Sequence, residues 1–161
     1  MSVAFKRRIV REKVLQILYA YEMNNENLLA LTQSMLGDVE DEHDKKFGED
    51  LVNRVLINKK ELDSKIEERV SNWEMGRIAL IDKLLLRMTI CELLHFPDIP
   101  PKVSINEAIE IAKDFSTAGS GKFINGILDA ILADEKSSGR LVKTGRGLVD
   151  ETLAKNRHKA N

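Results

Sequence analysis

Apolar residues recur along most of the chain at intervals of three and four positions, the period of a helix packed on one side. This spacing predicts a helix over residues 5–23 and a second over 28–36 that ends before Gly37. Residues 41–70 form either one long helix or two with a break near Asn58. Further helices are expected over 104–115 and after a loop at 116–121. No stretch shows the sustained alternation of a strand, so the expected fold class is all-α.

Residues 75–95 form the most apolar part of the chain. Twelve of the seventeen residues at positions 78–94 are apolar, and they spread around most of the circumference of a helix. A helix that is apolar on nearly every side is surrounded by other helices. We therefore expect the central helix of a bundle here, ended by the proline-rich connection at 97–101.

The helix predicted at 104–115 opens with a start signal. Ser104 followed three residues later by Glu107 matches a capping box, in which each side chain accepts a hydrogen bond from the other residue's backbone N–H. After about residue 133 apolar positions become few. This divides the chain into a helical domain over 1–133 and a basic tail over 134–161, expected to be flexible or to hold a loose helix around 148–156.

Charge is nearly balanced, with 25 Lys and Arg against 26 Asp and Glu, but it is segregated along the chain. Residues 6–13 carry five cations against Glu12, residues 38–50 carry seven acids against two lysines, and the tail carries seven cations against four acids. Cations in the first turns of a helix oppose the helix dipole. Their presence predicts a polyanionic partner whose phosphates they bind; the alternative is a solvated helix face.

The sequence shows no catalytic constellation. The stretch at 119–122 (Gly-Ser-Gly-Lys) lacks the first glycine of a Walker A loop and the Ser or Thr after its lysine. Glu92 and His95 have the spacing of a di-iron ligand pair, but the three histidines are scattered along the chain and Cys91 has no partner cysteine. We therefore expect no enzymatic activity and no metal or other cofactor.

The cellular location is predicted from the lack of a disulfide framework, of a membrane-spanning stretch and of a signal peptide. The single cysteine, Cys91, excludes a disulfide framework and is expected to be a small core residue. Four charged residues interrupt positions 78–94, whose uncharged stretches are far shorter than the roughly 20 residues that cross a bilayer. The basic N-terminus has no apolar signal-peptide core. These features predict a soluble cytoplasmic protein.

Three segments of the chain together carry a resemblance to a known family. The first is Lys6-Arg7-Arg8 with Arg11-Glu12 and Gln16-Ile17-Leu18-Tyr19; the second is Arg77-Ile78-Ala79-Leu80 with Leu86-Arg87 and Cys91-Glu92-Leu93. The third runs over 100–110, through Lys113-Asp114-Phe115, to 122–129, with apolar, polar and glycine positions all in agreement. Across residues 5–133 the chain resembles the NusB family of bacterial transcription antitermination factors.

The resemblance implies a NusB-like bundle of about seven helices in two small packed subdomains with a central apolar helix. Members of the family bind the boxA element of RNA together with the small-subunit ribosomal protein that acts as NusE. The pair joins an antitermination complex on RNA polymerase and promotes processive transcription, notably of ribosomal RNA. The family includes monomers and homodimers, and a homodimer would cover the basic helix until RNA or the partner arrives.

Carried over position by position, the resemblance assigns two groups of residues. The RNA-binding residues are Lys6, Arg7, Arg8, Arg11 and Gln16 on the first helix, and Lys122, Phe123 and Asn125 at the start of the last. The partner-binding residues are Tyr19, Glu22 and Asp82, where the basic ribosomal protein would dock. Physical chemistry agrees for the last helix, since an aromatic ring stacks on an unpaired base and a helix start favours a phosphate.

Other interpretations stay open at this point. Phe123 and Tyr19 would also suit core positions, Gly126 would suit a close approach of two helices, and Arg87 would suit either a buried ion pair or the RNA surface. An accessory domain of a ribosomal RNA methyltransferase would need a further cofactor-binding domain, for which this chain has no room. A purely protein-binding module would keep its activity after the arginines of the first helix are neutralised.

Overall fold

The computed structural model describes residues 2–149, and every regular element within that range is a helix. The elements are α1 (Val3–Asn24), α2 (Leu28–Leu36), α3 (Glu42–Ile57), α4 (Lys59–Glu67), α5 (Asn72–Met75), α6 (Leu80–His95), α7 (Pro101–Phe115), α8 (Ser120–Ser137) and the 3₁₀ helix η1 (Gly145–Leu148). The all-α prediction is confirmed. None of the described helices is long and apolar enough to cross a membrane.

Most helix boundaries follow from local signals in the sequence. Ser2 starts α1, because its hydroxyl oxygen accepts a hydrogen bond from the N–H of Phe5. Asn58 separates α3 from α4 at the predicted break. The central helix begins later than predicted, at Leu80, because a capping box between Ser71 and Glu74 starts the separate short helix α5.

The capping box predicted at Ser104 and Glu107 is wrong. α7 begins at Pro101, whose fixed φ and missing N–H suit the first helical position. Ser104 and Glu107 therefore lie inside the helix, and both are buried. Their side chains hydrogen-bond across the bundle instead, Ser104 donating to Glu92 and Glu107 accepting from Arg8.

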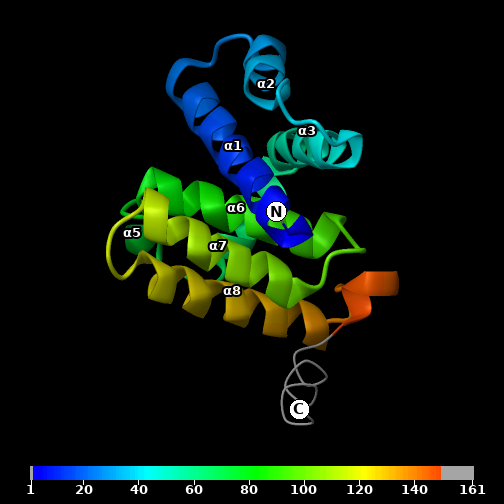
Figure 1. Ribbon diagram of the computed structural model, residues 1–161. Helices are drawn as coiled ribbons and strands as arrows, with labels where there is room; N and C mark the ends of the chain where they lie inside the picture. Colours follow the sequence, from blue (N-terminus) through cyan, green and yellow to red (C-terminus); the bar gives the residue numbers. More distant parts are fainter. Residues whose placement is uncertain (1, 150–161) are drawn as a thin grey trace.

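Two groups of helices cross each other (Figure 1). α1, α2 and α3 form one group, and α6, α7 and α8 lie side by side in the other, with α4 and α5 behind them. α6 packs against α1, α3, α4, α7 and α8, and eleven of its sixteen residues are buried. Cys91 lies on this helix, and burial raises the pKa of its thiol to about 12. The predicted central helix is therefore present, with Cys91 as a core residue.

Two arginines place charge in this interior. Arg87 of α6 is 5% exposed and donates from Nε to Asp63 of α4 at 2.7 Å, which identifies it as half of a buried ion pair. Arg11 of α1 is 4% exposed and donates from Nε and Nη2 to both carboxylate oxygens of Glu92, at 2.7–3.3 Å. The hydroxyl of Ser104 donates to the same carboxylate at 2.9 Å. The Arg11–Glu92 pair thus joins the two groups of helices.

The end of α8 lies beyond the predicted domain boundary. α8 continues to Ser137, so the boundary at residue 133 falls inside a helix. Glu135, in its last turn, is 1% exposed and forms ion pairs with Lys65 and Arg140. Residues 150–161, and with them most of the loose helix predicted around 148–156, lie outside the described residues.

The segment at 138–149 packs against the corner between α6 and α7. Lys143 Nζ donates to the carbonyl oxygens of Glu92 and Phe96 at the C-terminus of α6, at 3.1 and 2.9 Å. Gly147 lies so close that a Cβ there would be 1.9 Å from the carbonyl oxygen of Pro97. This segment therefore adds a cationic donor at the helix end, to two carbonyl oxygens that also accept the backbone N–H groups of Phe96 and Ile99.

Replacing Arg11 with methionine is expected to lower the free energy of unfolding by about 3–5 kcal/mol, because it leaves the Glu92 carboxylate buried without a counter-charge. Urea unfolding followed by circular dichroism measures the change. The double variant Arg11→Met, Glu92→Leu removes both charges and is expected to recover most of the loss. A loss below about 1 kcal/mol in the single variant, the value of an exposed pair, would contradict this role.

Lys143 predicts a pH dependence of stability at alkaline pH. Burial lowers the pKa of its ammonium group from 10.5 to about 8, so the unfolded chain binds more protons between these values. The contribution of Lys143 to the free energy of unfolding therefore rises with pH across that window and is flat below it. Urea unfolding at a series of pH values should show this rise as a growing difference between the protein and Lys143→Met. Parallel profiles for the two proteins would disprove it.

Candidate nucleic-acid interface

The cations of α1 do not oppose the helix dipole as the sequence suggested. Because α1 starts at Val3, Lys6 lies at the end of its first turn and Arg7 and Arg8 lie beyond it, where the dipole has little effect. The helix dipole therefore does not call for a polyanionic partner of these cations. What these side chains bind has to be read from their contacts.

Arg7 and Arg8 are each paired with a carboxylate of another helix. Arg7 donates from Nε to Asp44 of α3 at 2.7 Å, and its guanidinium lies over the ring of Phe47, 4.4 Å from the centroid. Arg8 donates from Nε and Nη2 to both oxygens of Glu107 in α7, at 2.8 and 3.0 Å. Their side chains stay 28% and 31% exposed, so each guanidinium keeps further N–H donors available.

Arg11 does not belong with the surface residues. Its guanidinium is buried, and its Nε and Nη2 donate to the two carboxylate oxygens of Glu92. The geometry does not support the predicted contact of Arg11 with RNA phosphates, because exposing this side chain would leave Glu92 buried and uncompensated. Arg11 instead fixes the position of α1, and with it the positions of Arg7 and Arg8.

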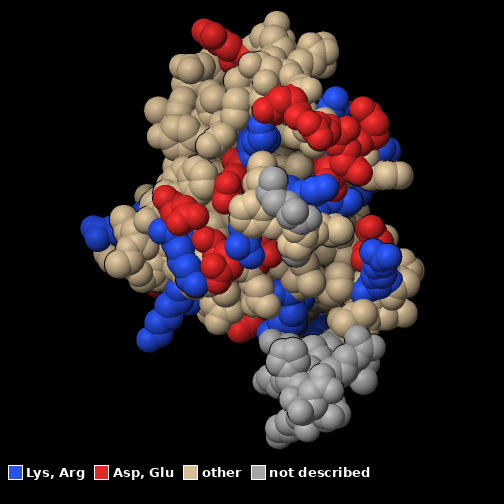
Figure 2. Space-filling view, viewed as in Figure 1, with Lys and Arg blue, Asp and Glu red and all other residues tan. Residues whose placement is uncertain are grey.

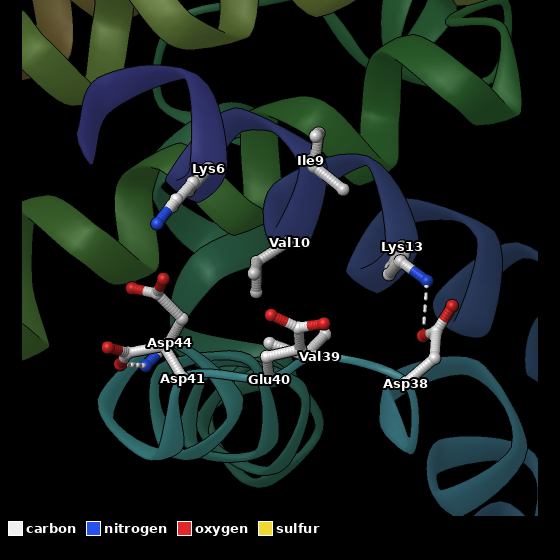
Figure 3. Close-up of a pocket in the computed structure, with 9 residues that line it drawn as sticks. All are labelled: Lys6, Ile9, Val10, Lys13, Asp38, Val39, Glu40, Asp41 and Asp44. Carbon is white, nitrogen blue, oxygen red and sulfur yellow. Dashed lines mark hydrogen bonds and ion pairs between the residues drawn. The ribbon is translucent and has the colours of Figure 1, made fainter. Parts of the chain in front are cut away.

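Lys6 and Gln16 are the exposed members of the predicted set on α1. Lys6 borders a pocket of about 230 Å³ between α1 and the loop that leads into α3, with Val10 and Val39 among its apolar lining residues. Its ammonium points toward Asp41 and Asp44 across this pocket (Figure 3). Figure 2 shows the resulting surface, where acids over the start of α3 gather beside cations. The face is therefore of mixed charge.

The three residues predicted to bind the protein partner differ in exposure. Tyr19 is 39% exposed. The nearby Glu22 is also exposed, and its carboxylate forms an ion pair with Nζ of Lys59 at 3.8 Å. Asp82 is 6% exposed and accepts hydrogen bonds from the hydroxyls of Ser116 and Ser120, at 2.7 and 3.0 Å. Its charge is directed at the α7–α8 loop, so the geometry does not support Asp82 as a surface contact.

The start of α8 presents the second predicted group. Lys122 is exposed, Phe123 is 39% exposed and Asn125 is half-buried. The N-cap residue is Gly119, which has no side chain to accept from the first backbone N–H groups. Phe123 is thus not a core anchor, and backbone donors, a cation and an aromatic face lie together at this helix end.

The interpretation of Gly126 as a point where two helices pack closely is wrong. A Cβ built at Gly126 would meet nothing within 4 Å. The residue is exposed on α8, one turn after Phe123. Gly126 therefore leaves open space beside the aromatic ring.

The two predicted RNA-binding groups are separate on the surface. Arg8 of α1 pairs with Glu107 near the middle of α7, whereas α8 begins at the end of the α6–α7–α8 group that lies near α5 (Figure 1). Consistent with this, Lys122 and Phe123 line a cleft with residues of the α4–α5 region and not with α1. An RNA that contacts both groups must extend along the molecule.

Sequence reasoning missed the residues that hold the arginines. Asp44, Phe47 and Glu107 lie 37 to 99 positions away from them in the chain. One signal was available, since Glu107 and Glu92 occupy otherwise apolar helix faces, and a buried carboxylate needs a cationic partner. Within the described residues, no group of three or more His, Cys, Asp or Glu side chains is placed to hold a metal ion.

Comparisons with known proteins agree with this architecture. The NusB family model matches residues 8–133. The transcription antitermination protein NusB of Salinibacter ruber is 49% identical over 147 residues, which cover 89% of this chain and 91% of the relative. The solved structure of T. maritima NusB has a TM-score of 0.74 and 35% identity, covering 80% of this chain and 91% of that one.

A further solved structure shares the fold at lower identity. It is a complex of the antitermination factors NusB and NusE with double-stranded RNA, with a TM-score of 0.72, 23% identity, and coverage of 80% of this chain and 97% of the matched chain. Family model, close relative and fold agree over the same helical region. The chain belongs to the NusB family.

Proposed function

We propose that this protein is a transcription antitermination factor that binds a boxA-type single-stranded RNA together with the ribosomal protein NusE. The observation that carries the RNA contact is the start of α8, where exposed Phe123 and Lys122 adjoin backbone N–H groups without a side-chain cap. Aromatic stacking suits any unpaired base, and a helix start with a lysine suits the adjacent phosphate.

α1 contributes a second contact through oriented donors. Asp44 and Glu107 hold one edge of the Arg7 and Arg8 guanidinium groups, and the exposed part of each side chain faces the RNA. Lys6 and Gln16 extend this surface. Because each arginine is already neutralised by a carboxylate, α1 binds RNA through the geometry of its hydrogen bonds more than through excess charge.

Two exposed residues of α1 are suited to contact a protein partner. Tyr19 offers an amphipathic ring and Glu22 a carboxylate that suits a basic ribosomal protein. NusE is assigned because a family structure is described as a complex of NusB and NusE with RNA. We infer further that the assembly acts on RNA polymerase. We also infer that this protein forms a homodimer that covers α1 and dissociates when RNA and NusE bind. A homodimer that persists in sedimentation experiments at saturating RNA and NusE would contradict this dissociation.

Phe123→Ala is expected to weaken binding of a boxA-type RNA by about 5- to 150-fold, the range that corresponds to about 1–3 kcal/mol for one stacked base. Fluorescence anisotropy of labelled RNA, with and without NusE, measures the change. Leu29→Ala is the matched control, because it removes an exposed apolar side chain on α2. Equal binding of boxA and scrambled RNA by the unaltered protein would refute the proposed function itself.

Lys6→Gln is expected to make the salt dependence of RNA binding shallower by about 0.7 in the slope of log K against log salt, the value for one phosphate contact on a single strand. Titrations at several salt concentrations give the slope. Lys60→Gln removes an exposed lysine from α4 and serves as the control. An unchanged slope in Lys6→Gln would exclude the Lys6 contact and favour a protein-binding role for α1.

A further inference from the structure

A cleft of about 350 Å³ lies beside Phe123, between α8 and the segment that joins α4 to α5. Arg69, Val70 and Glu74 line one side, and Phe123, Gly126 and Ile127 line the other. We call it the Gly126 cleft. Except for Phe123, none of these six residues is used by the RNA contacts proposed above.

The open space in this cleft depends on a glycine inside a helix. Gly126 lies in the middle part of α8, where alanine would favour the helix more than glycine does. No close neighbour requires the glycine, since a Cβ would meet nothing within 4 Å. Phe123 and Gly126 are three residues apart, so they share one face of the helix. The missing side chain therefore leaves open space in the cleft that Phe123 also lines.

The walls of the cleft match the parts of a nucleotide. Phe123, Val70 and Ile127 provide apolar surface for a planar base. Lys122, which also lines the cleft, and Arg69, which is held in place by Asp134, provide cations for the flanking phosphates. A ring with two cations around an open slot is the arrangement that binds single-stranded nucleic acid.

Glu74 adds selectivity to this arrangement. Its Oε2 accepts a hydrogen bond from the backbone N–H of Ser71 at 2.7 Å, which fixes the carboxylate at the start of α5. Hydrogen bonds from the backbone N–H and the side chain of Ser71 lower the pKa of the Glu74 carboxyl, which makes it a negatively charged acceptor. A fixed carboxylate oxygen accepts from the exocyclic amino group of a base. Cytosine, adenine and guanine carry such a group, and uracil does not.

We propose that the Gly126 cleft binds one unpaired nucleobase of the RNA, stacked on Phe123 above Gly126, with its amino group donating to Glu74. The inference rests on the proposed function, because it concerns the same RNA, and it adds a defined base-binding site with a preference against uracil. The apolar side chain of a protein partner is the other class of occupant, and the experiment separates the two.

The first test fills the cleft. In Gly126→Leu the backbone accepts the new Cβ without a clash, and the leucine side chain occupies the slot. RNA binding measured by anisotropy is expected to fall by about 5- to 150-fold, the range expected for loss of one stacked base. Ala133→Leu adds the same side chain at an exposed site of α8 outside the cleft and should bind RNA normally. Thermal unfolding of both variants verifies that they are folded.

The second test uses the RNA. An abasic nucleotide is introduced at each position of the boxA-type RNA in turn, and the affinity of each RNA is measured. At one position, removal of the base should weaken binding to the unaltered protein and leave the affinity for Gly126→Leu unchanged. At that position uracil should bind more weakly than cytosine, adenine or guanine. Glu74→Gln, which a capping box tolerates, should reduce this discrimination.

The outcomes separate the cleft from the proposed function. If the unaltered protein binds boxA selectively and Phe123→Ala weakens it, but Gly126→Leu binds as tightly as Ala133→Leu, the cleft proposal is overturned while the function stands. If Gly126→Leu weakens NusE binding and leaves RNA binding unchanged, the cleft belongs to a protein partner and the proposal is also overturned. Failure of the unaltered protein to select boxA would overturn the function instead.

Discussion

The buried pair between Arg11 and Glu92 is the constraint on which the arrangement of the two helix groups depends. Two guanidinium donors meet two carboxylate oxygens, a geometry that fixes both the rotation of α1 and its height along α6. Ser104 from α7 donates to the same carboxylate, so three helices meet at one charged group. Sliding or rotating α1 against α6 would separate the two charges and leave each of them buried without its partner, which carries a large cost in free energy.

The position of α1 determines what its other arginines can do. Arg7 and Arg8 lie about one helical turn before Arg11, and in the position of α1 that the Arg11–Glu92 pair helps to hold they reach Asp44 and Glu107. The most basic stretch of the sequence therefore appears on the surface as paired, oriented donors beside an acidic helix start. Recognition by such a surface depends on where its remaining N–H groups point, and less on the number of charges.

The end of α6 is reinforced from the opposite side by the C-terminal segment. Lys143 donates to the backbone carbonyl of Glu92, the same residue whose side chain holds Arg11. The close contact of Gly147 with Pro97 keeps that segment against the corner that follows α6. The junction of the helix groups and the segment at 138–149 thus share Glu92, whereas Phe123 at the start of α8 lies at the other end of the bundle (Figure 1).

The sequence by itself determined most of the helices, because period, caps and breakers act within a few residues; it did not give the short helix α5 or the start of α7. The central helix, the break at Asn58 and the end of α2 at Gly37 all followed from such local signals. It also identified Phe123 and Lys122 as candidates for an exposed site. Only the tertiary structure decided that Arg11 and Asp82 are buried, that Glu107 pairs with Arg8, and that Gly126 leaves a cleft open. The reason is physical: a residue's type limits which contacts it can make, but the partner comes from a helix distant in sequence, and burial depends on how the helices cross.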